Sequence, residues 1–121
     1  MLQILLVTTQ EHIRDEVDRN LTNGLSRPFR LHWVAEPHLA FVRAQDLLPQ
    51  VILVDDELGG SDPIPIIRKL ATAVSNAVLL FLVDKNQASE ASQAVLVGAR
   101  SFVTKPLHMP HLFALVEREL L

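Results

Sequence analysis

The chain is 121 residues long and 49% hydrophobic, which predicts a single folded domain, residues 1–121, with a substantial core. Its formal net charge is −3 and it has no cluster of Lys and Arg, so we expect no direct binding to nucleic acid. It has no cysteine and no apolar run long enough to cross a membrane, which excludes disulfides and membrane spans and favours a cytoplasmic protein.

The N-terminal segment predicts a strand followed by a helix. Leu2–Val7 is a short, almost entirely apolar run, as expected for a buried strand. Thr8 and Glu11 have the spacing of a capping box, so Thr8 is predicted to be the N-cap of the helix. Apolar residues then recur every four positions, which predicts an amphipathic helix with Gly24 as the residue just after its end.

The next segments predict a strand, a second helix and a second buried strand. Residues 29–35 alternate partly between apolar and polar side chains, as a strand near a sheet edge does. Pro37 is suited to the first turn of a helix, and Pro49 would end that helix. Residues 51–54 are uniformly apolar and mostly β-branched, which is typical of a strand covered by helices on both faces.

The C-terminal half repeats the alternation. Asp62 is predicted to cap a third helix that has Pro63 in its first position, and residues 77–83 predict another strand buried on both faces. The remaining predicted elements are a helix of small residues over 86–97 that ends at Gly98, a short strand over 100–104 and a helix from Pro110.

Five strands that alternate with five helices predict an α/β fold. Strict alternation implies a parallel sheet with right-handed crossovers and helices on both faces. We therefore expect a flavodoxin-like (βα)5 three-layer sandwich with the strand order 2-1-3-4-5. Ligands of such folds bind at the carboxyl edge of the sheet, where Asp55, Asp56 and Glu57 follow the third strand.

Three motifs resemble those of the receiver domains of two-component response regulators, and the resemblance covers essentially the full chain. They are ILLVTTQ near the N-terminus, PQVILVDDELGGSDP around the third strand and GARSFVTKPL around the fifth. The resemblance implies a domain of phosphorelay signal transduction that is not an enzyme. It also implies that Asp55 is the phosphoacceptor, Lys105 the lysine that contacts the phosphoryl group, and Phe102 the switch aromatic, although Phe102 equally suits a core position.

Two departures from the family pattern concern the chemistry. Thr8 and Thr9 replace the acidic pair that helps to bind Mg²⁺ in receivers, and threonine hydroxyls carry no charge. Val83 replaces the Ser or Thr that holds a phosphoryl oxygen, and valine cannot donate a hydrogen bond. Because phosphoryl transfer depends on neutralising the charge of the transferred oxygens, these departures predict an atypical receiver, or pseudo-receiver, without a cofactor.

Asp55 has two interpretations. In the favoured one it is an unreactive carboxylate in a static ion pair with Lys105; in the alternative it is a working phosphoacceptor that uses Mg²⁺. Asp55 and Asp56 would then be weak metal ligands, although strand alternation starts Asp56 on the opposite side. A solvated loop is an equally acceptable interpretation of Asp56 and Glu57.

Other polar and aromatic residues have simpler structural explanations. Thr8 and Thr9 could hold a small anion at a helix N-terminus, but helix capping is the favoured interpretation. Trp33 is predicted to pack on the second strand. His108 and His111 have the spacing of a pair of metal ligands but lack a third ligand, so we interpret them as surface histidines.

The resemblance also implies protein partners. Receivers accept phosphate from a histidine kinase, and their usual interaction face is formed by the fourth helix, the fifth strand and the fifth helix. Here that face would carry Arg100, Glu117 and Arg118 beside Ala91 and Ala94. We therefore expect a regulatory interaction module that forms a homodimer, or binds another protein, through this face.

A flavodoxin-like FMN carrier is a remote alternative from a different functional class. The hydroxyls of Thr8 and Thr9 could bind the phosphate of the cofactor. However, their turn has no glycine, and the chain has no Tyr and only six aromatic residues to enclose a flavin ring. The sequence therefore disfavours this function.

Overall fold

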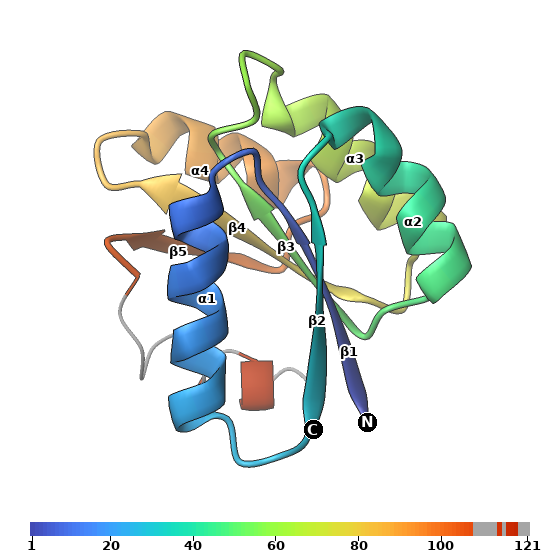
Figure 1. Ribbon diagram of the computed structural model, residues 1–121. Helices are drawn as coiled ribbons and strands as arrows, with labels where there is room; N and C mark the ends of the chain where they lie inside the picture. The colour runs from blue at the N-terminus through green and yellow to red at the C-terminus, as the bar shows by residue number, and fades with distance from the viewer. Residues whose placement is uncertain (108–113, 115, 119–121) are drawn as a thin grey trace.

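The computed structural model describes residues 1–107, 114 and 116–118. Its centre is a sheet of five parallel strands in the order β2-β1-β3-β4-β5 (Figure 1). The strands are β1 (Leu2–Val7), β2 (Phe29–Val34), β3 (Val51–Asp55), β4 (Val78–Asp84) and β5 (Ser101–Lys105). The predicted α/β class, flavodoxin-like architecture and strand order are confirmed.

Helices cover both faces of the sheet, as Figure 1 shows. The α-helices are α1 (Glu11–Gly24), α2 (Ala40–Leu47), α3 (Pro63–Ala73) and α4 (Ala88–Leu96), and a 3₁₀ turn at Pro37–Leu39 precedes α2. Most of the helix predicted from Pro110 lies outside the described residues. Of its residues, 114 and 116–118 are described, and they are helical. Within the described part of the chain, no helix has the length and apolar character needed to cross a membrane.

Strand side chains alternate between the two faces, so the sheet supports two apolar cores. The first core lies under α1, which contributes Ile13, Val17 and Leu21, and it also contains Val116. The second core lies under α2, α3 and α4 and contains Phe81 of β4. Because helices cover both faces, β1, β3 and β4 are almost completely buried, which explains their apolar sequences.

The ends of α1 differ from the prediction. Gln10 is the N-cap, without a side-chain cap, so the predicted capping box of Thr8 and Glu11 is wrong. Gly24 is the last helical residue, not the residue after the helix. The cap of α3 is as predicted, because Asp62 accepts the N–H of the residue two positions on at 3.0 Å.

Gly98 follows the shortened α4 at a position that requires glycine. Its φ of +132° lies in a region that side chains with a Cβ rarely adopt. A Cβ built there would lie 2.5 Å from the Cβ of Ala71 on α3. Gly98 therefore permits the close approach of α3 to the turn that leads into β5.

The register of the strands brings three chain segments to one edge of the sheet. Asp55 of β3 pairs with Leu82 of β4, and Asp84 of β4 pairs with Lys105 of β5. The second half of β1 pairs with β3 on the other side. The residues that follow β1, end β3 and end β5 therefore meet at the carboxyl edge, where ligand crevices of this fold lie.

Candidate functional site

Four polar side chains form one cluster at the carboxyl edge. They are Thr8 after β1, Asp55 and Asp56 at the end of β3, and Lys105 at the end of β5. The contact predicted between Asp55 and Lys105 is present. Thr8 and Asp56 join it through contacts that the sequence did not predict. We call these four residues the Asp55 cluster.

Asp55 is completely buried, with 0% of its surface exposed. The hydroxyl of Thr8 donates a hydrogen bond of 2.6 Å to its Oδ2. The ammonium of Lys105 forms an ion pair with Oδ1, which accepts no aligned hydrogen bond from the described residues. Protein atoms therefore contact both carboxylate oxygens, and neither faces solvent.

Asp56 shares the lysine with Asp55. Its Oδ1 lies 2.5 Å from Nζ of Lys105, and its Oδ2 accepts the backbone N–H of Asp84 at 2.9 Å. Strand alternation predicted that Asp56 would start on the opposite side, but its carboxylate reaches the same ammonium group of Lys105 as Asp55 does. The solvated-loop interpretation describes the exposed Glu57 but not Asp56.

Burial and pairing act in opposite directions on these groups. Burial raises the pKa of Asp55, and the contact with Lys105 and the hydrogen bond from Thr8 offset this only in part. Burial alone would also raise the pKa of Asp56, but hydrogen bonds from Lys105 and from the N–H of Asp84 lower it. Burial would lower the pKa of Lys105, but its bonds to both acids raise it. Of the two acids, Asp55 is therefore the one that binds a proton more readily.

Thr9 ties the loop after β3 to the end of β1. Its hydroxyl and its N–H both donate to the carbonyl of Glu57, at 3.0 and 3.3 Å. The hydroxyl of Thr8 accepts the N–H of Gln10 at 3.0 Å in a short turn before the helix. Trp33 packs on β2 as predicted and also donates from Nε1 to the carbonyl of Thr8 at 2.9 Å. The two threonines thus hold the β3 loop, and their interpretation as helix caps is wrong.

The two positions that would transmit a switch lie in different environments. Val83 is buried in the core under α2, α3 and α4. Phe102 projects outward from β5 and is 41% exposed, so its interpretation as a core residue is wrong. Because Val83 has no hydroxyl, its side chain provides no hydrogen bond toward Asp55.

The Asp55 cluster does not fit a Mg²⁺ ion. Mg²⁺ requires a near-octahedral shell of oxygens. Here the ammonium of Lys105 is bound to both carboxylates, and the hydroxyl of Thr8 already donates to Asp55. Over residues 1–107, 114 and 116–118, no group of three His, Asp or Glu side chains is arranged to hold a metal ion.

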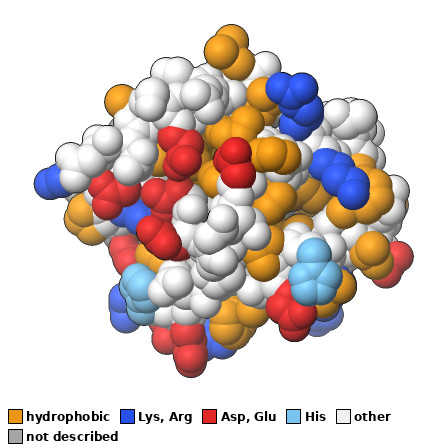
Figure 2. Space-filling view, turned by 90° about the horizontal axis from the view of Figure 1, so that it is seen from above, with side chains coloured by type: hydrophobic (Ala, Val, Ile, Leu, Met, Phe, Trp, Pro, Cys, Tyr) orange, Lys and Arg blue, Asp and Glu red, His pale blue; other side chains and the backbone are white. Residues whose placement is uncertain are grey.

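Figure 2 shows several acidic side chains gathered on one part of the face seen from above. Burial raises the pKa of Glu90 on α4, and the nearby charges of Asp56, Asp62 and Glu57 raise it further. The surface around Glu90, near Asp56, Glu57 and Asp62, is therefore negatively charged.

The face formed by α4 and β5 differs from the prediction. Ala91 and Ala94 do not lie on it, because they pack in the core beneath α4. Glu117 accepts a hydrogen bond of 3.0 Å from the hydroxyl of Ser26, next to α1. The exposed apolar side chains of α4 and β5 are Val95, Leu96 and Phe102. Leu96 is 85% exposed, so the outer side of α4 is more apolar than the sequence suggested.

Sequence reasoning missed the contributions of Thr8 and Asp56 to the Asp55 cluster. A signal was available for Thr8, because it directly follows β1 and β1 neighbours β3 in the predicted strand order. For Asp56 the period-2 pattern was misleading, because its side chain reaches the same ammonium group as that of Asp55. The position of the last strand residue can be seen only in the folded chain.

The chain is similar to solved structures of receiver domains. No model of a protein family matches it, and neither does any curated protein. The signal receiver domain of a DNA binding response regulator from Colwellia psychrerythraea 34H matches with a TM-score of 0.87 and 20% identity, over 99% of this chain and 98% of that one. The chemotaxis response regulator CheY4 of Vibrio cholerae matches with a TM-score of 0.82 and 19% identity, over 98% of each chain.

A two-component response regulator from Clostridium difficile also matches, with a TM-score of 0.87 and 15% identity, over 99% of this chain and 96% of that one. In all three comparisons the backbone agrees over almost the whole length of both chains, although few residues are shared. This agreement includes the parallel sheet in the order 2-1-3-4-5. The chain therefore has the fold of the receiver domains of response regulators.

Proposed function

We propose that this chain is an atypical receiver domain that acts as a regulatory protein-interaction module in cytoplasmic signal transduction and is not an enzyme. The observation that carries the proposal is the complete burial of Asp55 between Thr8 and Lys105. A phosphoacceptor must present a carboxylate oxygen to the phosphorus atom in line with the leaving group. Here Thr8 would have to move before either a donor or a metal ion could reach Asp55.

The charges of the Asp55 cluster also favour an unphosphorylated domain. Lys105 is bound to two carboxylates, so its positive charge is already matched before any phosphoryl group arrives. Phosphorylation of Asp55 would add negative charge to a buried site that is surrounded by further acids. We therefore propose weak or no Mg²⁺-dependent phosphorylation at Asp55.

The interaction role is supported by the exposed apolar side chains of α4 and β5. Val95, Leu96 and Phe102 are all exposed and would be buried by association. We propose that a homodimer contact, or a contact with an effector protein or a histidine kinase, uses this face. It would form without phosphorylation.

Switching by phosphorylation of Asp55 is the second candidate function. One observation favours it: Lys105 lies against Asp55 at the positions that the resemblance assigns to the phosphoacceptor and its lysine. An FMN carrier remains a remote alternative. Flavin absorbance in the purified protein would support the FMN carrier over both receiver functions.

Mass spectrometry of the intact protein tests the proposal. The chain is incubated with acetyl phosphate and Mg²⁺, beside an Asp55→Ala variant, with an active receiver domain in the same reaction as a positive control. We expect the active receiver to gain the mass of one phosphoryl group and this chain to gain none. A stoichiometric gain that is lost in Asp55→Ala would establish the second candidate function.

Sedimentation velocity tests the interaction face separately. Leu96→Glu should abolish self-association or partner binding, whereas Val42→Glu, at an exposed valine on α2, should leave it unchanged. Equal effects of the two substitutions would contradict a role for the face formed by α4 and β5.

A further inference from the structure

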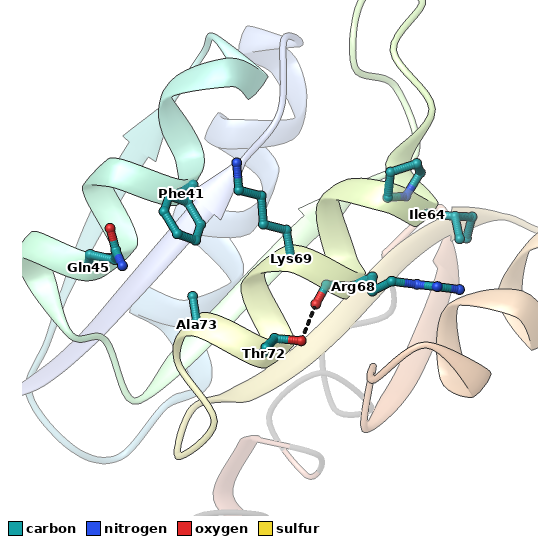
Figure 3. A pocket seen from close by; sticks show the side chains of 8 residues that line it. Phe41, Gln45, Ile64, Arg68, Lys69, Thr72 and Ala73 are labelled. Atoms are coloured by element: carbon teal, nitrogen blue, oxygen red, sulfur yellow. Dashed lines mark hydrogen bonds between the residues drawn. The ribbon is translucent and has the colours of Figure 1, made fainter.

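A second surface, away from the Asp55 cluster, is open and has a different chemistry. A hollow of about 660 Å³ lies along the outer side of α3 and extends to α2 (Figure 3). Phe41 from α2 and Ile64, Pro65 and Ala73 from α3 form its apolar lining. This volume lies within the range of protein binding sites. We call this surface the α3 groove.

The charged side chains that line the α3 groove are both positive, although the chain has a net charge of −3. Nζ of Lys69 lies 4.3 Å from the centre of the Phe41 ring, on the side of α2. Arg68 points to the other side of α3, as Figure 3 shows. Both cations are exposed. The apolar lining of the groove therefore has one cation, Lys69, over the ring of Phe41 and a second, Arg68, on the other side of α3.

The sequence of α3 carries more apolar residues than the core requires. Pro63, Ile67 and Leu70 are its buried residues and face the sheet. A surface helix normally places polar residues on its outer side. Ile64 and Pro65 instead line the open groove. Apolar side chains in a concave surface with a charged rim are characteristic of an interaction site.

We propose that the α3 groove binds a protein segment in which apolar side chains are flanked by Asp or Glu. The apolar side chains would fill the space between Phe41 and Ile64. The carboxylates would pair with Lys69 on one side of α3 and with Arg68 on the other. Such charge complementarity guides association and sets the orientation of the bound segment.

An anionic membrane surface is a poorer match for the α3 groove. The groove is concave, whereas a membrane surface is flat. Lipid-binding patches typically contain about four to eight Lys and Arg, and the lining of this groove has Lys69 and Arg68 alone. The proposed binding uses neither Asp55 nor the face of α4 and β5, so it can succeed or fail independently of the proposed function.

Two peptides of opposite charge test the proposal. The fluorescein-labelled peptide ELLEELLE supplies apolar side chains between acids, and KLLKKLLK is its charge-inverted control. We expect ELLEELLE to bind more tightly, by fluorescence anisotropy, and to shift amide signals of ¹⁵N-labelled protein in α2 and α3. Lys69→Glu and Arg68→Glu should each weaken binding about tenfold, whereas Arg19→Glu, at an exposed position on α1, should not.

Four results would overturn the proposal. Equal binding of the two peptides would show that charge complementarity has no role. Amide shifts confined to elements other than α2 and α3 would place the site elsewhere. Binding of vesicles that contain phosphatidylserine, without binding of ELLEELLE, would identify a lipid surface as the partner of the groove. A dimer that Lys69→Glu breaks would identify a second copy of the chain as the partner.

Discussion

The Asp55 cluster and the α3 groove differ in how their polar groups are satisfied. In the cluster, Asp55 and Asp56 are bound by Lys105, by a hydroxyl and by a backbone N–H of the same chain. In the groove, Arg68 and Lys69 are exposed beside apolar side chains, of which Phe41, Ile64 and Ala73 are only half-buried. The difference shows that the charged residues of an expected site can be bound by groups of the same chain, while a surface suited to a partner lies elsewhere.

Of the substitutions that test this comparison, the removal of Lys105 should have the largest effect on stability. Lys105→Met leaves Asp55 buried without its cation, so we expect the free energy of unfolding at neutral pH to fall by about 3–5 kcal/mol. Urea denaturation measures the loss. Lys85→Met, at an exposed lysine, should change stability by less than about 0.5 kcal/mol. The addition of Asp55→Asn to Lys105→Met should restore part of the loss, and no recovery would contradict the role assigned to the ion pair.

Thr8→Val should have the next largest effect. The substitution keeps the shape of the side chain but removes the hydroxyl that donates to Asp55, so we expect a loss of about 1–3 kcal/mol in urea denaturation. Thr8→Ser keeps the donor and should recover most of this stability. If Ser and Val variants were equally stable, the hydrogen bond to Asp55 would contribute nothing.

The pH dependence of stability separates the two acids. The pKa of Asp55 is raised by folding, so its contribution is fully present below about pH 3.9 and is lost as pH rises through the folded pKa. Asp55→Asn should therefore become more stable relative to the parent as pH rises, by about 1.4 kcal/mol for each pH unit between the folded and unfolded pKa values. Urea denaturation at a series of pH values from about 3 to about 8 measures this change.

Asp56 should behave in the opposite way. Its pKa is lowered by folding, so its contribution is present above about pH 3.9 and is lost as pH falls through the folded pKa. Asp56→Asn should therefore become less stable relative to the parent as pH rises toward neutrality. The same pH series measures it, and parallel curves for the two variants would contradict the separate roles of the two acids.

Lys69→Glu should have the smallest effect on stability. Its ammonium lies over the ring of Phe41 at an exposed position, so we expect a change below about 1 kcal/mol. Thermal denaturation of this variant beside Arg19→Glu measures it. A loss as large as that of Lys105→Met would show that Lys69 supports the fold and is not available to a partner.

Hydrophobic periodicity was sufficient to predict most of the fold. The uniformly apolar runs of β3 and β4, the alternation of strands with helices, and Asp62 as the cap of α3 were all read correctly, because each depends on neighbours in the chain. The start of α1 was read wrongly for the same reason. A capping box is a local pattern, and the hydroxyl of Thr8 found a stronger partner 47 residues away, in Asp55.

The sequence by itself determined the class of the fold, the strand order and the meeting of Asp55 with Lys105, since strand ends in a parallel sheet share one edge. Only the tertiary structure decided that Thr8 binds Asp55, that Asp56 shares Lys105 and that Phe102 faces outward. It also decided that apolar residues of α3 line an open groove. The physical reason is that hydrogen bonds and burial depend on distances between side chains far apart in the sequence, which residue patterns do not specify.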